Sequence, residues 1–307
     1  MDGSPGGRRV VVAGASGLIG GALCARLVER GDSVVRLVRR PPAGPGEVRW
    51  DPSTRRLDPH VLEGTAAVVN LAGAGVGDRR WTPSYKTEIL TSRTDTTHAV
   101  AAAVAQSGAP VRLVNASAVG FYGSRGDEEL TEDSGIGDGF LAEVVRAWEA
   151  STAPAVDAGA SVALARTGLV LAASGGAAGR LLTVARLGVG GPLGRGRQWW
   201  PWITLQDEVR ALLHLLDGDL RGPVNLTGPE PARQKDVARA LGRALGRPAV
   251  LPAPSLALRA VLGEFAGEIL ASQRVLPQRL LADGFLFEQP TLEAAVEWLL
   301  ADARRAP

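Results

Sequence analysis

Three glycines near the start of the chain have the spacing of a turn that binds phosphate groups. Gly14, Gly17 and Gly20 follow a short apolar run at residues 10–13, and an amphipathic stretch then extends to Gly31. In such a turn the first glycine allows the tight bend, the second lets the backbone approach a pyrophosphate, and the third lets the helix pack against the strand. The free N–H groups at the helix N-terminus then face the phosphates. This context favours a dinucleotide site over a purely structural turn.

The second apolar run, at residues 33–40, indicates which dinucleotide is expected. A site for NAD(H) usually places a carboxylate near the end of this strand, where it binds the ribose 2′-hydroxyl. Here the strand ends in Arg36, Arg39 and Arg40, and the nearest acid, Asp32, precedes it. A guanidinium group donates paired hydrogen bonds to a phosphate. We therefore expect NADP(H); the alternative is a solvated strand end in an arginine-rich protein.

The residues that usually perform chemistry beside such a cofactor are absent. Reductases of this kind use a tyrosine as general acid/base and a lysine, four residues later, that lowers the tyrosine pKa. The only tyrosines are Tyr85 and Tyr122 and the only lysines are Lys86 and Lys235, so no such pair exists. At the corresponding place, residues 138–149, the chain reads DGFLAEVVRAWE. This pattern predicts an amphipathic packing helix capped by its aspartate.

Two hydroxyl groups remain as catalytic candidates. Ser117 ends an apolar run, 111–116, at the edge of the predicted sheet where ligands bind in open α/β folds. It is expected to orient a carbonyl oxygen, or else to form a turn. Tyr122 follows in the next loop and would donate a proton only if a cation such as Arg93 or Arg125 lowered its pKa from about 10.

A second group of side chains predicts a substrate pocket. The stretch GRGRQWWPWI, residues 194–203, holds three of the seven tryptophans beside an arginine and a glutamine, at the junction of two expected domains. Aromatic side chains with a few polar groups suit a small-molecule pocket at a domain interface; packing between the domains is the alternative. We assign to this pocket Trp81, Arg197, Gln198, Trp200 and Trp202.

The order of strands and helices predicts the elements that position these groups. Apolar runs at residues 65–73, 111–120 and 161–171 alternate with helical patterns, which argues for an α/β fold with a doubly wound parallel sheet of the Rossmann type. Eight glycines between residues 174 and 196 predict a segment without a stable helix. We expect a Rossmann domain over 1–170, completed by 203–227, and a smaller, mostly helical C-terminal domain from 171–202 and 228–307.

Composition excludes several other classes of protein. The formal net charge is +2 and the arginines are dispersed, so nucleic-acid binding is not expected. No apolar run approaches the ~20 residues of a membrane span, and we expect a cytoplasmic protein. One cysteine, Cys24, and three scattered histidines provide no metal-ligand spacing, so no metal site is expected.

Several longer motifs give the chain a clear resemblance to a known family. It resembles the atypical nucleoside-diphosphate-sugar epimerase-like group of the extended short-chain dehydrogenase/reductase superfamily. Members are often labelled epimerase family proteins and sometimes cell-division inhibitors. The resemblance covers nearly the whole chain and rests on GASGLIG (14–20), NLAG (70–73), RRW (79–81), SR (92–93), SAVGFYG (117–123), RAWE (146–149), RTGLVL (166–171), GRQWWPWI (196–203) and SQRVLPQRLL (272–281).

This resemblance implies an NADPH-binding Rossmann domain with a small C-terminal domain over the nicotinamide end of the cofactor. The chain departs from the family pattern at Thr204, where histidine is frequent, and at Phe121, where tyrosine is common. Extended relatives are often dimers, so a homodimer is possible. The resemblance and the strand ends together assign to the cofactor Gly14, Ser16, Gly17, Leu18, Ile19, Gly20, Val38, Arg39, Arg40, Leu71, Ala72, Gly73, Glu88, Arg93 and Val170.

Two functional hypotheses follow. The first is an NADP(H)-dependent oxidoreductase or epimerase-like enzyme that acts on an unknown small carbonyl or hydroxyl compound. The second is a non-catalytic NADP(H) sensor or scaffold whose C-terminal helices engage a protein partner. The Ser117 strand end and the aromatic–polar pocket residues support the first, toward which fold analogy also leans. The missing Tyr–Lys pair beside an intact nucleotide turn supports the second.

Overall fold

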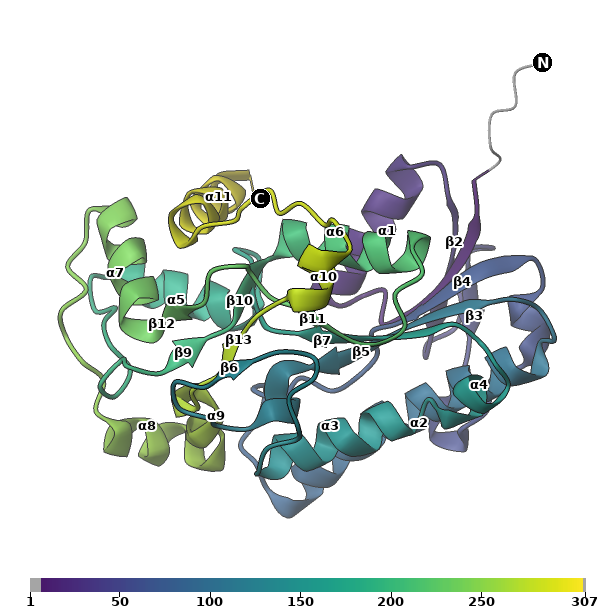
Figure 1. Ribbon diagram of the computed structural model, residues 1–307, viewed down its shortest axis with the longest axis horizontal. Coiled ribbons are helices and arrows are strands. Elements are labelled where there is room, and N and C mark those ends of the chain that lie inside the picture. Colours follow the sequence, from purple (N-terminus) through teal and green to yellow (C-terminus); the bar gives the residue numbers. More distant parts are fainter. Residues whose placement is uncertain (1–6, 306–307) are drawn as a thin grey trace.

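The computed structural model describes residues 7–305 and is built around a seven-stranded parallel sheet (Figure 1). The strand order is β11-β7-β5-β4-β1-β2-β3, and every neighbouring pair in it is parallel. The expected doubly wound sheet is thus confirmed. The strands are β1 (Arg9–Ala13), β2 (Ser33–Val38), β3 (Glu47–Arg49), β4 (Thr65–Asn70), β5 (Arg112–Ala118), β7 (Val162–Thr167) and β11 (Gly222–Leu226).

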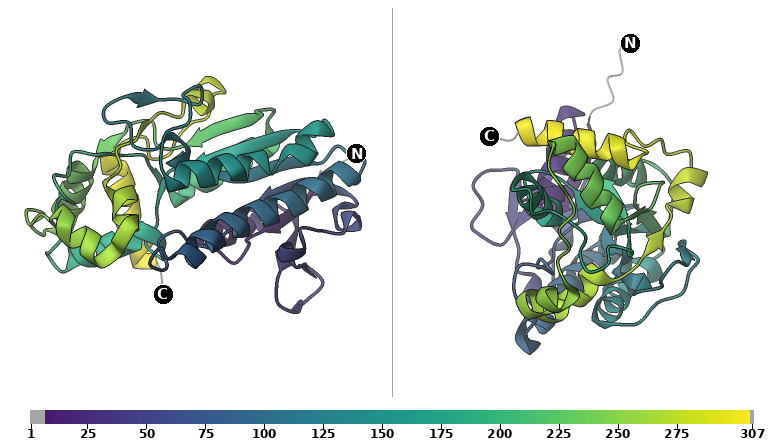
Figure 2. Two further views of the ribbon diagram at one scale, coloured as in Figure 1. Left: turned by 90° about the horizontal axis from the view of Figure 1, so that it is seen from below. Right: turned by 90° about the vertical axis from the view of Figure 1, so that its left-hand side faces the viewer.

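Helices cover both faces of this sheet because its strands are apolar on both sides. In β1, Val10 and Val12 pack with helices α1 (Leu18–Glu29) and α6 (Leu205–Asp217). Val11 and Ala13 point to the opposite face, which packs with helices α2 (Pro83–Gln106) and α4 (Ala153–Asp157). Such continuous apolar strands are typical of parallel sheets buried on both faces. Figure 1 shows α2 and α3 (Phe140–Ala150) below the sheet, and the view from below in Figure 2 shows these two helices side by side.

A second cluster of buried side chains lies beyond the carboxyl ends of the strands. It is formed mainly by helices α5 (Gly176–Arg186), α7 (Gln234–Leu245) and α11 (Leu292–Arg305), and it includes Trp200 and Trp202. Three short strand pairs join this region to the rest: β8 (Leu169–Leu171) with β10 (Trp202–Thr204), β9 (Trp199–Trp200) with β12 (Ala232–Arg233), and β6 (Glu129–Leu130) with β13 (Arg274–Val275). The remaining helices are α8 (Ser255–Leu262), α9 (Ala266–Leu270), α10 (Gln278–Ala282) and the short 3₁₀ turns η1 (Pro52–Thr54), η2 (Pro59–Leu62), η3 (Val119–Tyr122) and η4 (Gly263–Phe265).

The structure corrects two local predictions. The glycine-rich segment 174–196 does contain a helix, α5, because its glycines gather at the two ends and only Gly179 lies well inside. Leu182 of this helix is fully buried, so packing stabilises it beyond its weak intrinsic propensity. Helix α3 is the expected packing helix, but it begins after Gly139 and no side chain caps it, so the predicted aspartate cap is wrong.

The outer strand β11 has side-chain partners along its exposed edge. A Glu132 carboxylate oxygen accepts the backbone N–H of Asn225 at 2.9 Å. The Arg279 guanidinium donates to the carbonyl oxygens of Arg221 and Pro223, at 2.7 and 2.6 Å. Helix α10, which contains Arg279, packs against the same strand. These groups satisfy backbone atoms that have no neighbouring strand. Among residues 7–305, no helix is long and apolar enough to cross a membrane.

Candidate nucleotide-binding and active site

The glycine turn between β1 and α1 is shaped by close backbone contacts. Gly14 has φ +78°, and a Cβ there would lie 2.6 Å from the carbonyl carbon of Leu71. A Cβ on Gly20 would lie 2.1 Å from the Gly14 oxygen, so only glycine fits at either position. Gly17 is the N-cap of α1, whose first turn has no side-chain cap and no acidic residue. The helix N-terminus therefore offers free N–H groups to an anion.

The end of β4 lies directly against this turn. The backbone N–H of Leu71 donates to the Ala13 oxygen at 2.9 Å, which extends the β1–β4 pairing to the glycine turn. Leu71, Ala72 and Gly73 then leave the sheet at its carboxyl edge, and a Cβ on Gly73 would lie 3.2 Å from the Arg93 side chain. The structure thus brings together three of the predicted segments: the turn, residues 71–73 and Arg93.

The Arg93 side chain is partly buried and has no carboxylate partner among the described residues. It stacks 5.0 Å from the ring centroid of Trp148 and donates to the Ile89 oxygen at 2.9 Å. Burial lowers the pKa of Arg93 to about 10. A desolvated, uncompensated cation is costly, and a bound anion would offset that cost. Glu88, predicted from the same helix, is exposed and lies 3.5 Å from Arg79.

A buried network of hydrogen bonds holds the Trp148 ring, on which Arg93 stacks, in place. Asn70 at the end of β4 donates to Asn115 of β5 at 2.8 Å and to Thr97 of α2 at 3.0 Å. The indole N–H of Trp148 donates to the same Thr97 hydroxyl at 2.9 Å. The network links α2 and α3 to two central strands. It therefore fixes the ring on which Arg93 rests.

The arginines after β2 differ in their surroundings. Arg39 directly follows Val38, the last residue of β2. Its side chain is exposed and has no ion-pair partner among residues 7–305. Arg40, by contrast, forms a two-point ion pair with Glu47 of β3, at 2.6 and 2.7 Å. Of the two consecutive arginines predicted to bind the cofactor, only Arg39 is therefore free to do so. Val170 lies half-buried on β8, paired with Ile203.

Ser117 is at the predicted place, but its hydroxyl is already bound. The side chain is 3% exposed and its Oγ donates to a Glu149 carboxylate oxygen at 2.5 Å. The same carboxylate forms a two-point pair with Arg166 of β7, at 2.8 and 2.9 Å. Ser117 and Arg166 are register partners on neighbouring strands, so their side chains share a face of the sheet. The serine thus belongs to a buried ionic cluster.

Tyr122 lies in the same cluster and is fully buried. Its hydroxyl donates to Asn225 at 2.7 Å and accepts from Arg166 at 3.1 Å. The pKa of Tyr122 is raised, chiefly by burial, although Arg166 opposes this effect. The cation that contacts Tyr122 is Arg166, not Arg93 or Arg125 as expected. The pKa of Tyr122 is raised, whereas proton donation was expected to require a lowered pKa. This burial and bonding argue against Tyr122 as the proton donor.

Sequence reasoning missed the two charges at the centre of this cluster. Glu149 and Arg166 stand in motifs that carry the family resemblance, RAWE and RTGLVL, but 17 residues separate them along the chain. Phe121, the other departure from the family, stacks 3.6 Å from the Arg166 guanidinium. The signal in the sequence was Arg166, a charged residue inside an otherwise apolar strand.

The predicted pocket residues fall into two separate clusters. Trp200 and Trp202 are buried in the core beyond the sheet, and the Gln198 amide donates to the Leu193 oxygen at 3.1 Å. Trp81 lies elsewhere, in edge-to-face contact with Phe140 at 5.0 Å, and Arg197 is exposed. These contacts favour packing in the protein core over lining a pocket for Trp81, Trp200 and Trp202.

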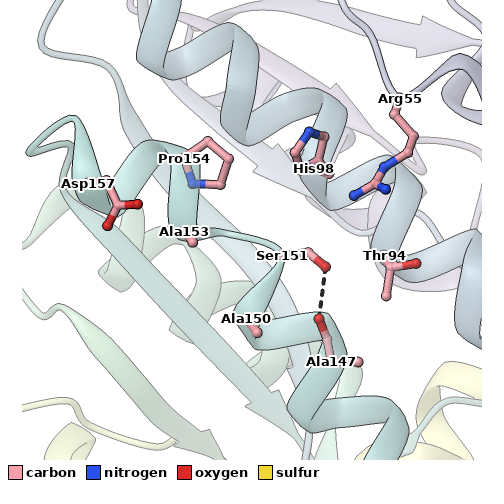
Figure 3. A pocket seen from close by; sticks show the side chains of 9 residues that line it. All are labelled: Arg55, Thr94, His98, Ala147, Ala150, Ser151, Ala153, Pro154 and Asp157. Atoms are coloured by element: carbon pink, nitrogen blue, oxygen red, sulfur yellow. Dashed lines mark hydrogen bonds between the residues drawn. The ribbon is translucent and has the colours of Figure 1, made fainter.

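A surface groove of about 590 Å³ lies between α2 and the α3–α4 segment (Figure 3). His98 and Thr94 line one side, and Ala150, Ser151 and Asp157 line the other. None of the predicted cofactor or substrate residues lines this groove. Within the described part of the chain, no group of three His, Cys, Asp or Glu side chains could hold a metal ion.

Glu208 is a further buried ionisable group at the carboxyl edge. It is 0% exposed, in the first turn of α6, and accepts the Thr167 hydroxyl at 2.7 Å. Its second oxygen has no partner among the described residues. Burial raises the pKa of Glu208 to about 8. The side chain is therefore mostly protonated at neutral pH.

Comparisons with known proteins agree with this geometry. Residues 10–226 match the model of the NAD dependent epimerase/dehydratase family, and residues 253–299 match a domain of unknown function, DUF1731. An epimerase family protein of Mycobacterium bovis is 45% identical, over 94% of this chain and 96% of its own. The human epimerase family protein SDR39U1 is 38% identical, over 95% of this chain and all of its own.

Solved structures show the same relationship. The crystal structure of human SDR39U1, isoform 2, with NADPH has a TM-score of 0.89 and 36% identity, over 97% of this chain and 100% of that one. A nucleoside-diphosphate sugar epimerase from Corynebacterium glutamicum has a TM-score of 0.80 and 36% identity, over 96% of this chain and 58% of that one. The family model covers residues 10–226, most of the chain, and the sheet order and the glycine turn agree with it. This chain therefore belongs to the NAD-dependent epimerase/dehydratase family.

Proposed function

We propose that this protein binds NADP(H) at the β1–α1 turn and uses it in oxidoreductase or epimerase-like chemistry on a small carbonyl or hydroxyl compound. The observation that carries the proposal is that residues 71–73 lie against both the glycine turn before α1 and the partly buried Arg93, which has no ion-pair partner among the described residues. The human relative crystallised with NADPH supports the choice of nucleotide.

The residues present fit such a cofactor. Gly14 and Gly20 make the tight turn possible, and Gly17 has no side chain that would keep a pyrophosphate away from the main chain. Arg39, free at the end of β2, would bind the 2′-phosphate. When bound, the nicotinamide supplies or accepts a hydride. The chain's contribution is to bind and orient the dinucleotide through the turn, Leu71–Ala72 and Arg93.

A specific observation favours a second candidate, a non-catalytic NADP(H) sensor or scaffold. Both hydroxyls with a predicted catalytic role, those of Ser117 and Tyr122, are bound in the Glu149–Arg166 cluster. A sensor requires different affinities for the oxidised and reduced cofactor, because a ligand shifts a conformational equilibrium only through differential binding.

Calorimetric titration with NADPH, NADP⁺ and NADH tests the proposal. We expect NADPH to bind more tightly than NADH, and Arg39→Ala to remove most of that difference while leaving NADH binding nearly unchanged. Binding of none of the three nucleotides would overturn both candidates. Stereospecifically deuterated NADPH, incubated with a panel of carbonyl compounds, then separates them: loss of label supports the enzyme, and retained label with unequal affinities for NADPH and NADP⁺ supports the sensor.

A further inference from the structure

The loop between β2 and β3 brings a carboxylate beside the expected 2′-phosphate site. Glu47, the first residue of β3, pairs in register with Arg36 of β2, and its side chain is only 13% exposed. It accepts two hydrogen bonds from Arg40, at 2.6 and 2.7 Å, and one from the backbone N–H of Ala43 at 2.6 Å. All of these contacts close the short loop that follows Arg39.

We propose that Glu47 is a specificity-determining residue: by holding Arg40, it limits the 2′-phosphate site to one arginine and so weakens the preference for NADP(H) over NAD(H). This inference rests on the proposed function of the nucleotide site. Arg40 directly follows Arg39, yet both of its terminal nitrogens are bound to Glu47, and one also donates to the Pro41 oxygen at 2.9 Å.

The physical basis is competition between two anions for one guanidinium. A carboxylate and a phosphate both match the planar fork of arginine, so Arg40 cannot offer the same two donors to both. The Arg40 contact and the Ala43 N–H lower the pKa of Glu47 to about 2, so the competing carboxylate is charged at every pH at which the protein is studied. The loop sequence, with Pro41, Pro42 and Pro45, restricts the backbone that carries Arg40.

The test compares Glu47→Gln with the wild-type protein in titrations with NADPH and NADH at low ionic strength. Glutamine keeps the shape of the side chain but removes its charge. We expect NADPH to bind on the order of twofold to fivefold more tightly to the variant, the range of an exposed ion pair, with NADH affinity unchanged. The gain should shrink in high salt because exposed charges are screened.

Three further proteins complete the experiment. In the double variant Glu47→Gln/Arg40→Ala the gain should vanish, because the freed guanidinium is its cause. Glu293→Gln removes the same charge from a remote ion pair, with Arg243, and should leave both affinities unchanged. Arg39→Ala reports separately on the site itself. If wild-type protein binds NADPH in an Arg39-dependent way but Glu47→Gln shows no gain or a loss, this inference is overturned while the proposed function stands. If wild-type protein binds neither nucleotide, the proposed function fails, and this inference with it.

Discussion

Replacing Glu208 with glutamine should stabilise the protein in a manner that depends on pH. The folded-state pKa of Glu208 is about 8, against an ordinary value of 4.5, because burial disfavours the charged carboxylate. Between these two values the unfolded chain releases this proton and the folded chain keeps it. The free energy of unfolding therefore falls as pH rises from 4.5 to 8. Each pKa unit is worth about 1.4 kcal/mol, so the loss is about 3 kcal/mol at pH 7 and about 5 kcal/mol above pH 8.

Urea denaturation at pH 5, 7 and 9, followed by tryptophan fluorescence, measures this effect. Every other titrating group is shared by the two proteins, so it cancels from the difference between wild type and variant. Glutamine preserves a hydrogen bond with Thr167 and cannot ionise, so the two proteins should differ by less than about 1 kcal/mol at pH 5. At pH 9 the variant should be more stable by several kcal/mol.

A matched control is Glu143→Gln on α3, where the carboxylate is exposed and pairs with Arg146. Because that carboxylate is exposed to solvent, the effect of removing its charge should be less than about 1 kcal/mol and nearly constant across the three pH values. A Glu208→Gln variant with the same stability difference at all three pH values, or one less stable than wild type at pH 9, would refute the reasoning.

Three further predictions concern Arg93 and two residues of the buried ionic cluster, Glu149 and Tyr122. Arg93→Met should weaken NADPH binding at least tenfold while leaving the cofactor-free protein as stable as before or more so, because a desolvated cation without an ion-pair partner is costly; calorimetry and thermal melting check the two effects separately. Glu149→Gln should destabilise the fold by about 3 kcal/mol or more by leaving Arg166 unpaired, whereas a change within about 0.5 kcal/mol in urea denaturation would contradict the buried ion pair. Tyr122→Phe should cost about 1 to 2 kcal/mol of stability and leave NADPH affinity unchanged in titration, which separates a structural tyrosine from one that contacts the cofactor.

The nucleotide turn and the sheet could be predicted because their signals are local in the sequence. Gly14 and Gly20 stand where any Cβ would collide with nearby backbone, so the residue type itself reports the geometry. The continuous apolar runs of β1 and β4 report burial on both faces of a parallel sheet. Arg93 was assigned to the site only through the family resemblance; its burial and its stacking on Trp148 became visible in three dimensions.

The polar cluster and the helix in the glycine-rich segment could not be predicted for a different reason. Glu149 and Arg166 lie on a helix and a strand that meet only in the folded protein, and nothing in the spacing of the two residues indicates the pairing. Likewise, Leu182 stabilises α5 by packing against distant residues, which overrides the low helix propensity of the surrounding sequence. The ion pair of Arg40 could not be predicted for the same reason, because its partner Glu47 lies on the far side of a loop.

The covered edge of β11 has a consequence for how copies of this protein can associate. An open outer strand is a template on which the strand of another molecule can add, and it is a common start of aggregation. Here Glu132 and Arg279 already occupy the backbone donor and acceptors that an incoming strand would use, and Pro223 removes one donor from the row. Joining two sheets at β11 would first require breaking charge-assisted hydrogen bonds. The edge strand that comes last in the sequence is thereby protected from pairing with a strand of a neighbouring molecule.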